Sequence, residues 1–275
     1  MDITAVGDVT LGWGESLVWD DERGRLYFVD CAASTLHWLD DGDDTLNTVT
    51  LPSMCAGIVP TDREGVLVGA LDDGLYVIDP DAGATELLAA YPEQLGGRCN
   101  DMCADTGGNL ITGKLNIGPA EGSAWRYEAA GDRWTLIDPD ISNTNGPQVG
   151  VIDGVTTLVI GDSSTHYYRY DYDPTTGAVG DRSIFGNMDD VDGVADGTTL
   201  DADGGLWCAL YDGSQLVRFT TDGLDRTIPL PVKDPTDVTF GGPDLDRLYV
   251  VSLGPLLVVD GLGTTGRPEP RFALG

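Results

Sequence analysis

The hexad Glu15-Ser-Leu-Val-Trp-Asp20 is the first of six related hexads. In each of them the first residue, here called the opening residue, is followed by a short and mainly apolar run. The other five are Gly57-Ile-Val-Pro-Thr-Asp62, Asn100-Asp-Met-Cys-Ala-Asp105, Asn145-Gly-Pro-Gln-Val-Gly150, Asp196-Gly-Thr-Thr-Leu-Asp201 and Asp237-Val-Thr-Phe-Gly-Gly242. Their first residues lie 42, 43, 45, 51 and 41 residues apart, and five of the six carry a carboxylate or a carboxamide. A period of about 40 to 50 residues indicates a repeat architecture.

The segments between the hexads have the pattern of β-hairpins. In Asp201-Ala-Asp-Gly-Gly-Leu-Trp-Cys-Ala-Leu210, an Asp/Gly turn joins the hexad to a second apolar run. A further pair of strands follows in several units, as in Gly74–Asp79 and Gln215–Phe219. Four strands in a unit of this length are typical of a propeller blade. Because six units account for almost the whole chain, we expect residues 1–275 to form a single all-β domain, a six-bladed β-propeller.

The two ends of such a ring must meet. We expect Leu256–Asp260 to pair with the N-terminal strand and close the propeller. The alternative is a two-sheet sandwich built from similar hairpins. Sustained helical periodicity is nearly absent, and the regular period favours the propeller over the sandwich.

The first residues of the hexads are candidates for a metal site. The innermost strands of propeller blades run along a central channel, so equivalent residues converge on one axis. Glu15, Asn145 and Asp196 supply two carboxylates and one amide oxygen, and Asn100 is a further oxygen donor. Hard cations such as Ca²⁺, Mg²⁺ and Mn²⁺ favour these ligands, so we predict a metal site at the mouth of the central channel. The alternative is that the polar residues only cap turns. The absence of thiolate and imidazole from the ring argues against structural zinc.

The charge of the chain restricts its partners. It contains 38 Asp and 8 Glu against 13 Arg and two Lys, which gives a formal net charge of −31. Nucleic acid and anionic membrane surfaces are excluded as expected partners, because phosphate binding needs clustered Lys and Arg. One explanation of the acidity is a halophilic host, whose salt screens carboxylate repulsion. The other is local use of Asp in β-turns, although this does not explain the scarcity of Lys.

The cysteines and the terminal sequence bear on location. Five cysteines, at positions 31, 55, 99, 103 and 208, are odd in number and include no CxxC pair, so they cannot form a complete disulfide framework. No apolar stretch approaches the length of a membrane span, and the N-terminus lacks a basic region followed by an apolar one. We expect a soluble protein in the cytoplasm.

Several motifs along the chain resemble the gluconolactonase/regucalcin-like family. They follow the order of the family from about residue 10 to the C-terminus. They are Gly14-Glu15-Ser-Leu-Val-Trp19, Gly24-Arg-Leu-Tyr-Phe-Val-Asp30, Arg98-Cys-Asn-Asp101, Asn145-Gly146, Tyr170-Asp-Tyr-Asp-Pro174, Asp196-Gly197, Asp201 through Gly213, Pro235-Thr-Asp-Val-Thr-Phe-Gly-Gly242 and Gly266-Arg-Pro-Glu-Pro-Arg-Phe272.

The resemblance implies a six-bladed propeller with one catalytic divalent metal on its axis, and an enzyme that usually hydrolyses sugar lactones. By motif, Glu15, Asn145 and Asp196 match the metal ligands, and Asp196 also matches the proposed general base. Arg98 and Asn100 match residues that face the substrate, and Asn100 sometimes reaches the metal. For Arg98, the alternative is a salt bridge at the rim with one of the many carboxylates.

Departures from the family pattern leave the implied ligands intact and bear on the substrate. Ser16 replaces a usual Pro, Met102 a usual Gly, and Ala195 a common Pro. Asp237 stands at the sixth strand mouth where Ser or Thr is usual, which makes it a candidate substrate-binding or specificity residue. Lys114 places a positively charged side chain near the expected pocket. The alternatives for it are a contact with a substrate oxygen, an ion pair with Asp237, or exposure to solvent.

The leading hypothesis is therefore a metal-dependent lactonase, a carboxylic ester hydrolase of carbohydrate metabolism that acts on an aldonolactone. Its cofactor is one divalent cation, Ca²⁺, Mg²⁺, Mn²⁺, Zn²⁺ or Fe²⁺, and its partner is a small sugar lactone. We expect a monomer or weak homo-oligomer. One alternative keeps the metal but changes the chemistry to phosphotriester hydrolysis, rearrangement or cyclisation. Another is a non-catalytic calcium-binding or protein-interaction propeller. His166 is a candidate substrate contact from a loop near the mouth.

Overall fold

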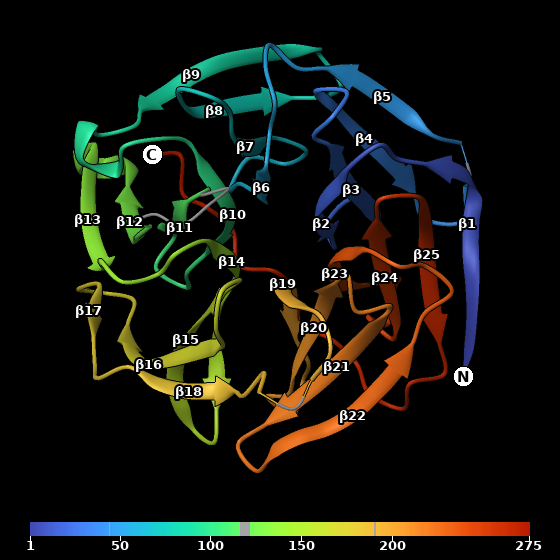
Figure 1. The fold of residues 1–275 in the computed structure, drawn as a ribbon. Coiled ribbons are helices and arrows are strands. Elements are labelled where there is room, and N and C mark those ends of the chain that lie inside the picture. The colour runs from blue at the N-terminus through green and yellow to red at the C-terminus, as the bar shows by residue number, and fades with distance from the viewer. Residues whose placement is uncertain (44, 116–121, 190) are drawn as a thin grey trace.

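A computed structural model describes residues 1–43, 45–115, 122–189 and 191–275, and these form six antiparallel sheets arranged as a ring (Figure 1). Five sheets have four strands, and the fourth sheet along the chain has one additional strand. Strands that are consecutive in sequence lie side by side within the sheets, except that the additional strand of the fourth sheet, β18, pairs with β16 and not with β17. The predicted all-β six-bladed propeller is confirmed.

The strands of the first three blades are β2 (Gly14–Asp20), β3 (Arg25–Asp30), β4 (Thr35–Asp40), β5 (Asn47–Thr50), β6 (Gly57–Pro60), β7 (Leu67–Ala70), β8 (Gly74–Asp79), β9 (Ala84–Ala90), β10 (Cys99–Ala104), β11 (Leu110–Lys114), β12 (Ala124–Glu128) and β13 (Arg133–Asp138). Those of the other three are β14 (Thr144–Ile152), β15 (Val155–Asp162), β16 (Tyr167–Asp173), β17 (Ala178–Val179), β18 (Ser183–Gly186), β19 (Val194–Leu200), β20 (Leu206–Tyr211), β21 (Gln215–Thr220), β22 (Gly223–Pro229), β23 (Pro235–Gly241), β24 (Arg247–Ser252), β25 (Pro255–Asp260) and β1 (Asp2–Thr10). The helical segments of the described residues are two 3₁₀ turns, η1 (Glu93–Leu95) and η2 (Ala129–Gly131), and neither can cross a membrane.

The sixth blade combines the two ends of the described chain. β1 pairs antiparallel with β25, with Asp2 opposite Asp260 and Ala5 opposite Leu257. Figure 1 shows β1 along the outer edge of the ring beside β25. This confirms the predicted closure. Opening the ring at this point requires breaking a backbone ladder.

Aspartates at the ends of inner strands fix the hairpin turns. Asp201 Oδ1 accepts the backbone N–H groups of Asp203 and Gly205 at 3.0 and 2.8 Å. Its Oδ2 accepts from Trp207 Nε1 at 2.9 Å and from Arg218 Nε at 2.6 Å. The carboxylate therefore satisfies turn N–H groups that the strands leave unpaired, and its buried charge has a cationic partner.

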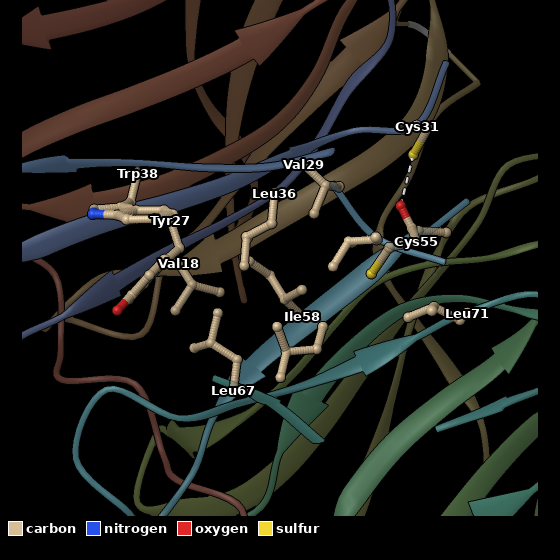
Figure 2. Packing of buried hydrophobic residues seen from close by; sticks show 13 residues of the cluster. Val18, Tyr27, Val29, Cys31, Leu36, Trp38, Cys55, Ile58, Leu67 and Leu71 are labelled. Carbon is tan, nitrogen blue, oxygen red and sulfur yellow. Dashed lines mark hydrogen bonds between the residues drawn. The ribbon is translucent and has the colours of Figure 1, made fainter. Parts of the chain in front are cut away.

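The hydrophobic core lies between neighbouring blades. Figure 2 shows the contact between the first and second blades, where Tyr27, Leu36 and Ile58 are completely buried. Burying a large apolar side chain stabilises the fold by about 1.5–3 kcal/mol relative to its exposure. In the same cluster, Cys31 Sγ donates to the Cys55 carbonyl at 3.0 Å. All five cysteines are buried free thiols.

The C-terminal segment crosses the channel at the end remote from the hexad openings. Phe272 forms a parallel bridge with Thr61 and is completely buried between the second and third blades. Glu269 and Pro270 line the channel together with residues of the inner strands. Arg271 forms ion pairs with carboxylates of the first hairpin. The segment thus ties together blades that are distant in sequence.

Candidate functional site

Four polar side chains from four blades meet at one end of the channel. Glu15, Asn100 and Asn145 are the second residues of β2, β10 and β14, and Asp196 is the third residue of β19. Each is only 5–8% exposed. All four line one pocket of about 400 Å³. The structure therefore brings the three predicted metal ligands together with the predicted further oxygen donor.

A β-bulge lies at each of these positions. In β14 and β2, the ladder register shifts directly after Asn145 and Glu15. In β10 and β19 the shift begins one residue earlier, so that Asn100 and Asp196 lie within it. A bulge leaves an extra residue unpaired, bends the strand and re-aims neighbouring side chains. Gly146, within this bulge, has a φ of 44°, and a Cβ there would lie 2.6 Å from Thr198. Glycine after Asn145 is thus required by both backbone conformation and space.

The carboxamide of Asn145 is held on both sides. Its Nδ2 donates to Ser163 Oγ and, at 3.3 Å, to the carbonyl of Ala195 on the next blade. Its Oδ1 accepts from Asn100 Nδ2 at 2.5 Å. Asn100 Nδ2 also donates to the Thr144 carbonyl at 2.9 Å. Because its nitrogen is committed to Ser163 and Ala195, the oxygen of Asn145 faces the opposite side, toward Asn100.

The Glu15 carboxylate has a hydrogen bond at one oxygen only. Trp13 Nε1 donates to Oε1 at 2.7 Å, whereas Oε2 is buried and has no hydrogen-bond partner among the described residues. Burial raises the pKa of Glu15 well above its usual value, the charges of Asp101 and Asp237 raise it further, and the Trp13 bond lowers it. Leaving a buried carboxylate oxygen unpaired is unfavourable, and a cation bound at Oε2 would remove that penalty.

Asp196 is held in place through its backbone. The Tyr167 hydroxyl accepts from the Asp196 N–H at 2.8 Å and donates to the Asp196 carbonyl at 3.0 Å. Burial raises the pKa of Asp196 well above its usual value, and the charge of Glu15 raises it further. A positive charge between the two carboxylates would relieve both effects.

This donor set fits a hard divalent cation. Two carboxylates and two carboxamides converge, and they supply oxygen ligands of the type that Ca²⁺, Mg²⁺ and Mn²⁺ prefer. In the part of the chain that the structure describes, no three His, Cys, Asp or Glu side chains group around a common point. A site here must therefore combine Glu15 and Asp196 with amide oxygens, as the sequence predicts, and with water.

The sixth blade is shifted by one residue from the register inferred from sequence. Thr236 Oγ1 donates to the Gly14 carbonyl at 2.5 Å. Asn100 and Asn145 make the same contact, because each donates to the carbonyl that immediately precedes the opening residue of the next blade. Thr236, rather than Asp237, is therefore the residue of the sixth blade that is equivalent to Asn100 and Asn145 at the mouth of the channel. The bulge in β23 begins correspondingly early, directly after Pro235.

Asp237 consequently lies one residue further along β23, inside the channel and away from its mouth. Its Oδ2 accepts from the Leu17 N–H at 2.6 Å, much as Asp101 Oδ2 accepts from the Gly146 N–H at 2.8 Å. Both carboxylates line the channel and not the described wall of the pocket. They join neighbouring inner strands, which gives Asp237 a structural explanation where the sequence suggested a substrate contact.

Three further residues considered from sequence lie outside the described pocket wall. Arg98 Nη1 pairs with Asp72 Oδ1 at 2.9 Å, which is the rim salt bridge considered as its alternative. Lys114 extends over Gly97, where an added Cβ would lie 3.3 Å from its Cε. His166 Nδ1 accepts a backbone N–H at 3.2 Å.

The pocket also contains wall residues that the sequence had not identified. They are Trp13, Leu115, Asn143, Ser163, Val194, Tyr211 and Leu253. Ala195, noted from sequence as a departure from the family pattern, lines the pocket beside them. Three of them, Trp13, Asn143 and Val194, stand two residues before an opening residue. The repeat thus carried a signal for these positions. The repeat does not indicate Ser163, because this residue follows the adjacent strand β15 and contacts Asn145 from there.

Comparison with known proteins agrees with this geometry. The family model described as SMP-30/Gluconolactonase/LRE-like region matches residues 13–254. The pentonolactonase XacC of Haloferax volcanii is 31% identical over 273 residues, covering 98% of this chain and 90% of the relative. The 6-deoxy-6-sulfogluconolactonase of Pseudomonas putida is 32% identical over 249 residues, covering 87% and 82%.

Two solved structures have nearly the same fold along the whole length. A luciferin-regenerating enzyme superposes with a TM-score of 0.91 at 26% identity, covering 99% of both chains. A calcium-binding regucalcin from Agrobacterium tumefaciens superposes with a TM-score of 0.88 at 25% identity, covering 98% of this chain and 96% of the other. The chain therefore belongs to the SMP-30/gluconolactonase/LRE-like family.

Proposed function

We propose that the protein is a divalent-cation-dependent hydrolase that opens sugar lactones. The observation that carries the proposal is the convergence of Glu15, Asn100, Asn145 and Asp196 in one largely buried pocket. Two relatives over most of the chain are named for sugar lactones, a pentonolactone and a sulfogluconolactone, and this supports the substrate class.

The residues are suited to opening a lactone. Hydrolysis requires a water to attack the carbonyl carbon, a negative charge to develop on the carbonyl oxygen, and the ring C–O bond to break. A cation held by Glu15, Asn145 and Asp196 would supply Lewis acidity to that oxygen. Asp196 lies in the same pocket wall, where it is placed to accept the proton of the attacking water and to return it to the ring oxygen as the C–O bond breaks.

The remaining groups position these residues or the substrate. Ser163 holds the Asn145 amide in one orientation, and Tyr167 holds the Asp196 backbone. We assign Asn100 to contact the substrate, because it lies beside Asn145 in the pocket wall. Arg98 remains a candidate specificity residue, since it stands two residues before Asn100. It would have to exchange Asp72 for a substrate hydroxyl.

A substrate panel tests this function. Chelator-stripped protein, reloaded with one divalent ion at a time, would be assayed for acid release from pentono- and hexonolactones. We expect one group of lactones to be opened far faster than the spontaneous rate. Glu15→Gln is the matched control, because it keeps the volume of the side chain and removes its charge. A panel in which no lactone is accelerated, with a phosphotriester turned over instead, would contradict the lactonase proposal while retaining the metal site.

A further inference from the structure

Trp13 occupies a short connection whose backbone is tightly held. The residue lies between β1 and β2, two positions before Glu15. Asp30, at the end of β3, accepts the Gly12 N–H at 2.7 Å and the Trp13 N–H at 3.1 Å. The Trp13 carbonyl in turn accepts the Cys31 N–H at 2.8 Å. The first hairpin therefore fixes the point from which the indole enters the pocket.

The indole N–H of Trp13 donates to the Glu15 carboxylate. Trp13 Nε1 donates to Oε1 at 2.7 Å. Oε2 of the same carboxylate is buried without a hydrogen-bond partner in the described chain. A glutamate side chain has several rotatable bonds, so a single strong donor on one oxygen selects where the other oxygen points.

We propose that Trp13 is a positioning residue for the cation site, holding Glu15 by one oxygen so that the other is presented to the cation. This inference rests on the proposed function, because it takes Glu15 as a ligand. Carboxylates that bind metals are commonly held by hydrogen bonds from outer groups, and removing such a group typically weakens metal binding by about 10 to 100-fold. The Trp13 bond is charge-assisted and therefore belongs to the stronger class of hydrogen bonds.

The expected consequence of losing the Trp13 donor is weaker binding of the cation. Without the indole N–H, the Glu15 carboxylate can rotate among several conformations. The conformation that binds the cation is then populated for only part of the time. A Trp13→Phe variant keeps most of the aromatic wall and loses the donor. We expect its cation dissociation constant to rise by about 10 to 100-fold.

The experiment is a calorimetric titration of chelator-stripped proteins with Mn²⁺ or Ca²⁺, whichever the wild type binds more tightly. Trp13→His is the rescue variant, because His Nε2 occupies the ring position equivalent to Trp Nε1 and can carry a hydrogen. Trp134→Phe is the matched control. Its indole nitrogen is buried without a hydrogen-bond partner in the described residues, and the side chain packs in the third blade, away from the pocket wall. Thermal unfolding in chelator verifies that each variant folds.

The outcomes separate this inference from the proposed function. Weak binding by Trp13→Phe, partial recovery in Trp13→His and wild-type binding by Trp134→Phe would support it. Wild-type affinity in a folded Trp13→Phe protein would overturn it, while loss of binding in Glu15→Gln would still uphold the ligand set. Equal losses in Trp13→Phe and Trp13→His would also overturn it, because the effect would then come from packing. Failure of the wild type to bind either ion would overturn the ligand set and the inference together.

Discussion

Asn100 Nδ2 donates to Asn145 Oδ1 at 2.5 Å, joining two carboxamides that are 45 residues apart in sequence and belong to adjacent blades. Asn145 continues the connection to the Ala195 carbonyl, directly before Asp196. Three neighbouring inner strands are thus linked at the mouth by the side chains proposed to act there. The positions of Asn100, Asn145 and Asp196 therefore depend on one another.

This link predicts that Asn100 and Asn145 do not act independently. Asn100→Ala removes a donor to Asn145 and a proposed substrate contact, and we expect kcat/KM to fall by about 10 to 100-fold, or roughly 1.4–2.8 kcal/mol. Asn145→Ala should be at least as damaging. In the double variant the two effects should not add, because residues in contact couple by about 0.5–3 kcal/mol. Steady-state kinetics on the four proteins measures this. Full additivity would contradict the connection.

A second prediction concerns Asp237. Its oxygens accept the Leu17 and Val238 N–H groups, and it lines the channel below the pocket. Asp237→Asn retains one carbonyl oxygen for Leu17, so we expect KM and kcat to stay within about three-fold of wild type, which is less than 1 kcal/mol. Lactone kinetics on this variant is the measurement. A ten-fold rise in KM with unchanged stability would instead support the substrate contact suggested from sequence.

The sequence was sufficient to predict the fold and the convergence of the candidate site residues, because both depend on periodicity. The period of the hexads predicted six blades and the convergence of Glu15, Asn145 and Asp196. The apolar run Leu256–Asp260 predicted the closure of the ring, which β1 and β25 form. The register of β23 could not be read in this way, since the early bulge after Pro235 moved Thr236 into the mouth position. The contacts of side chains at the rim could not be predicted either. Whether Arg98 turns toward the pocket or toward Asp72 depends on packing between blades.

Stability should depend on pH through Glu269 at the far end of the channel. Burial raises the pKa of Glu269 from its ordinary 4.5 to about 7, and the charge of Asp21 contributes. The folded chain therefore binds this proton more tightly than the unfolded chain does. The stabilisation is complete below about pH 4.5 and is lost as the pH rises through 7.

The matched variant is Glu269→Gln. Between pH 5 and 8, we expect the free energy of unfolding of the wild type to fall by about 1–3 kcal/mol more than that of the variant. Urea unfolding in chelator at several pH values measures this difference. Parallel pH profiles for the two proteins would show that Glu269 titrates normally in the fold.

The net charge of −31 predicts a dependence of stability on salt. At low ionic strength the carboxylates repel one another over about 10 Å or more, whereas at 1 M salt the screening length is about 3 Å. We expect the melting temperature to rise steadily as KCl is increased into the molar range. If the aspartates serve only in local turns, the melting temperature will be nearly independent of KCl, and the halophilic explanation will be wrong.

The most direct test of the central claim is the rate of lactone opening as a function of added divalent ion, measured on stripped wild-type and Asp196→Ala proteins. The account predicts negligible catalysis in chelator and a wild-type rate that saturates near one ion per chain. It also predicts that Asp196→Ala will bind the ion more weakly and turn over at least 100-fold more slowly, a difference of about 2.7 kcal/mol in the barrier. Full wild-type activity in chelator, or unchanged ion binding and turnover in Asp196→Ala, would contradict it.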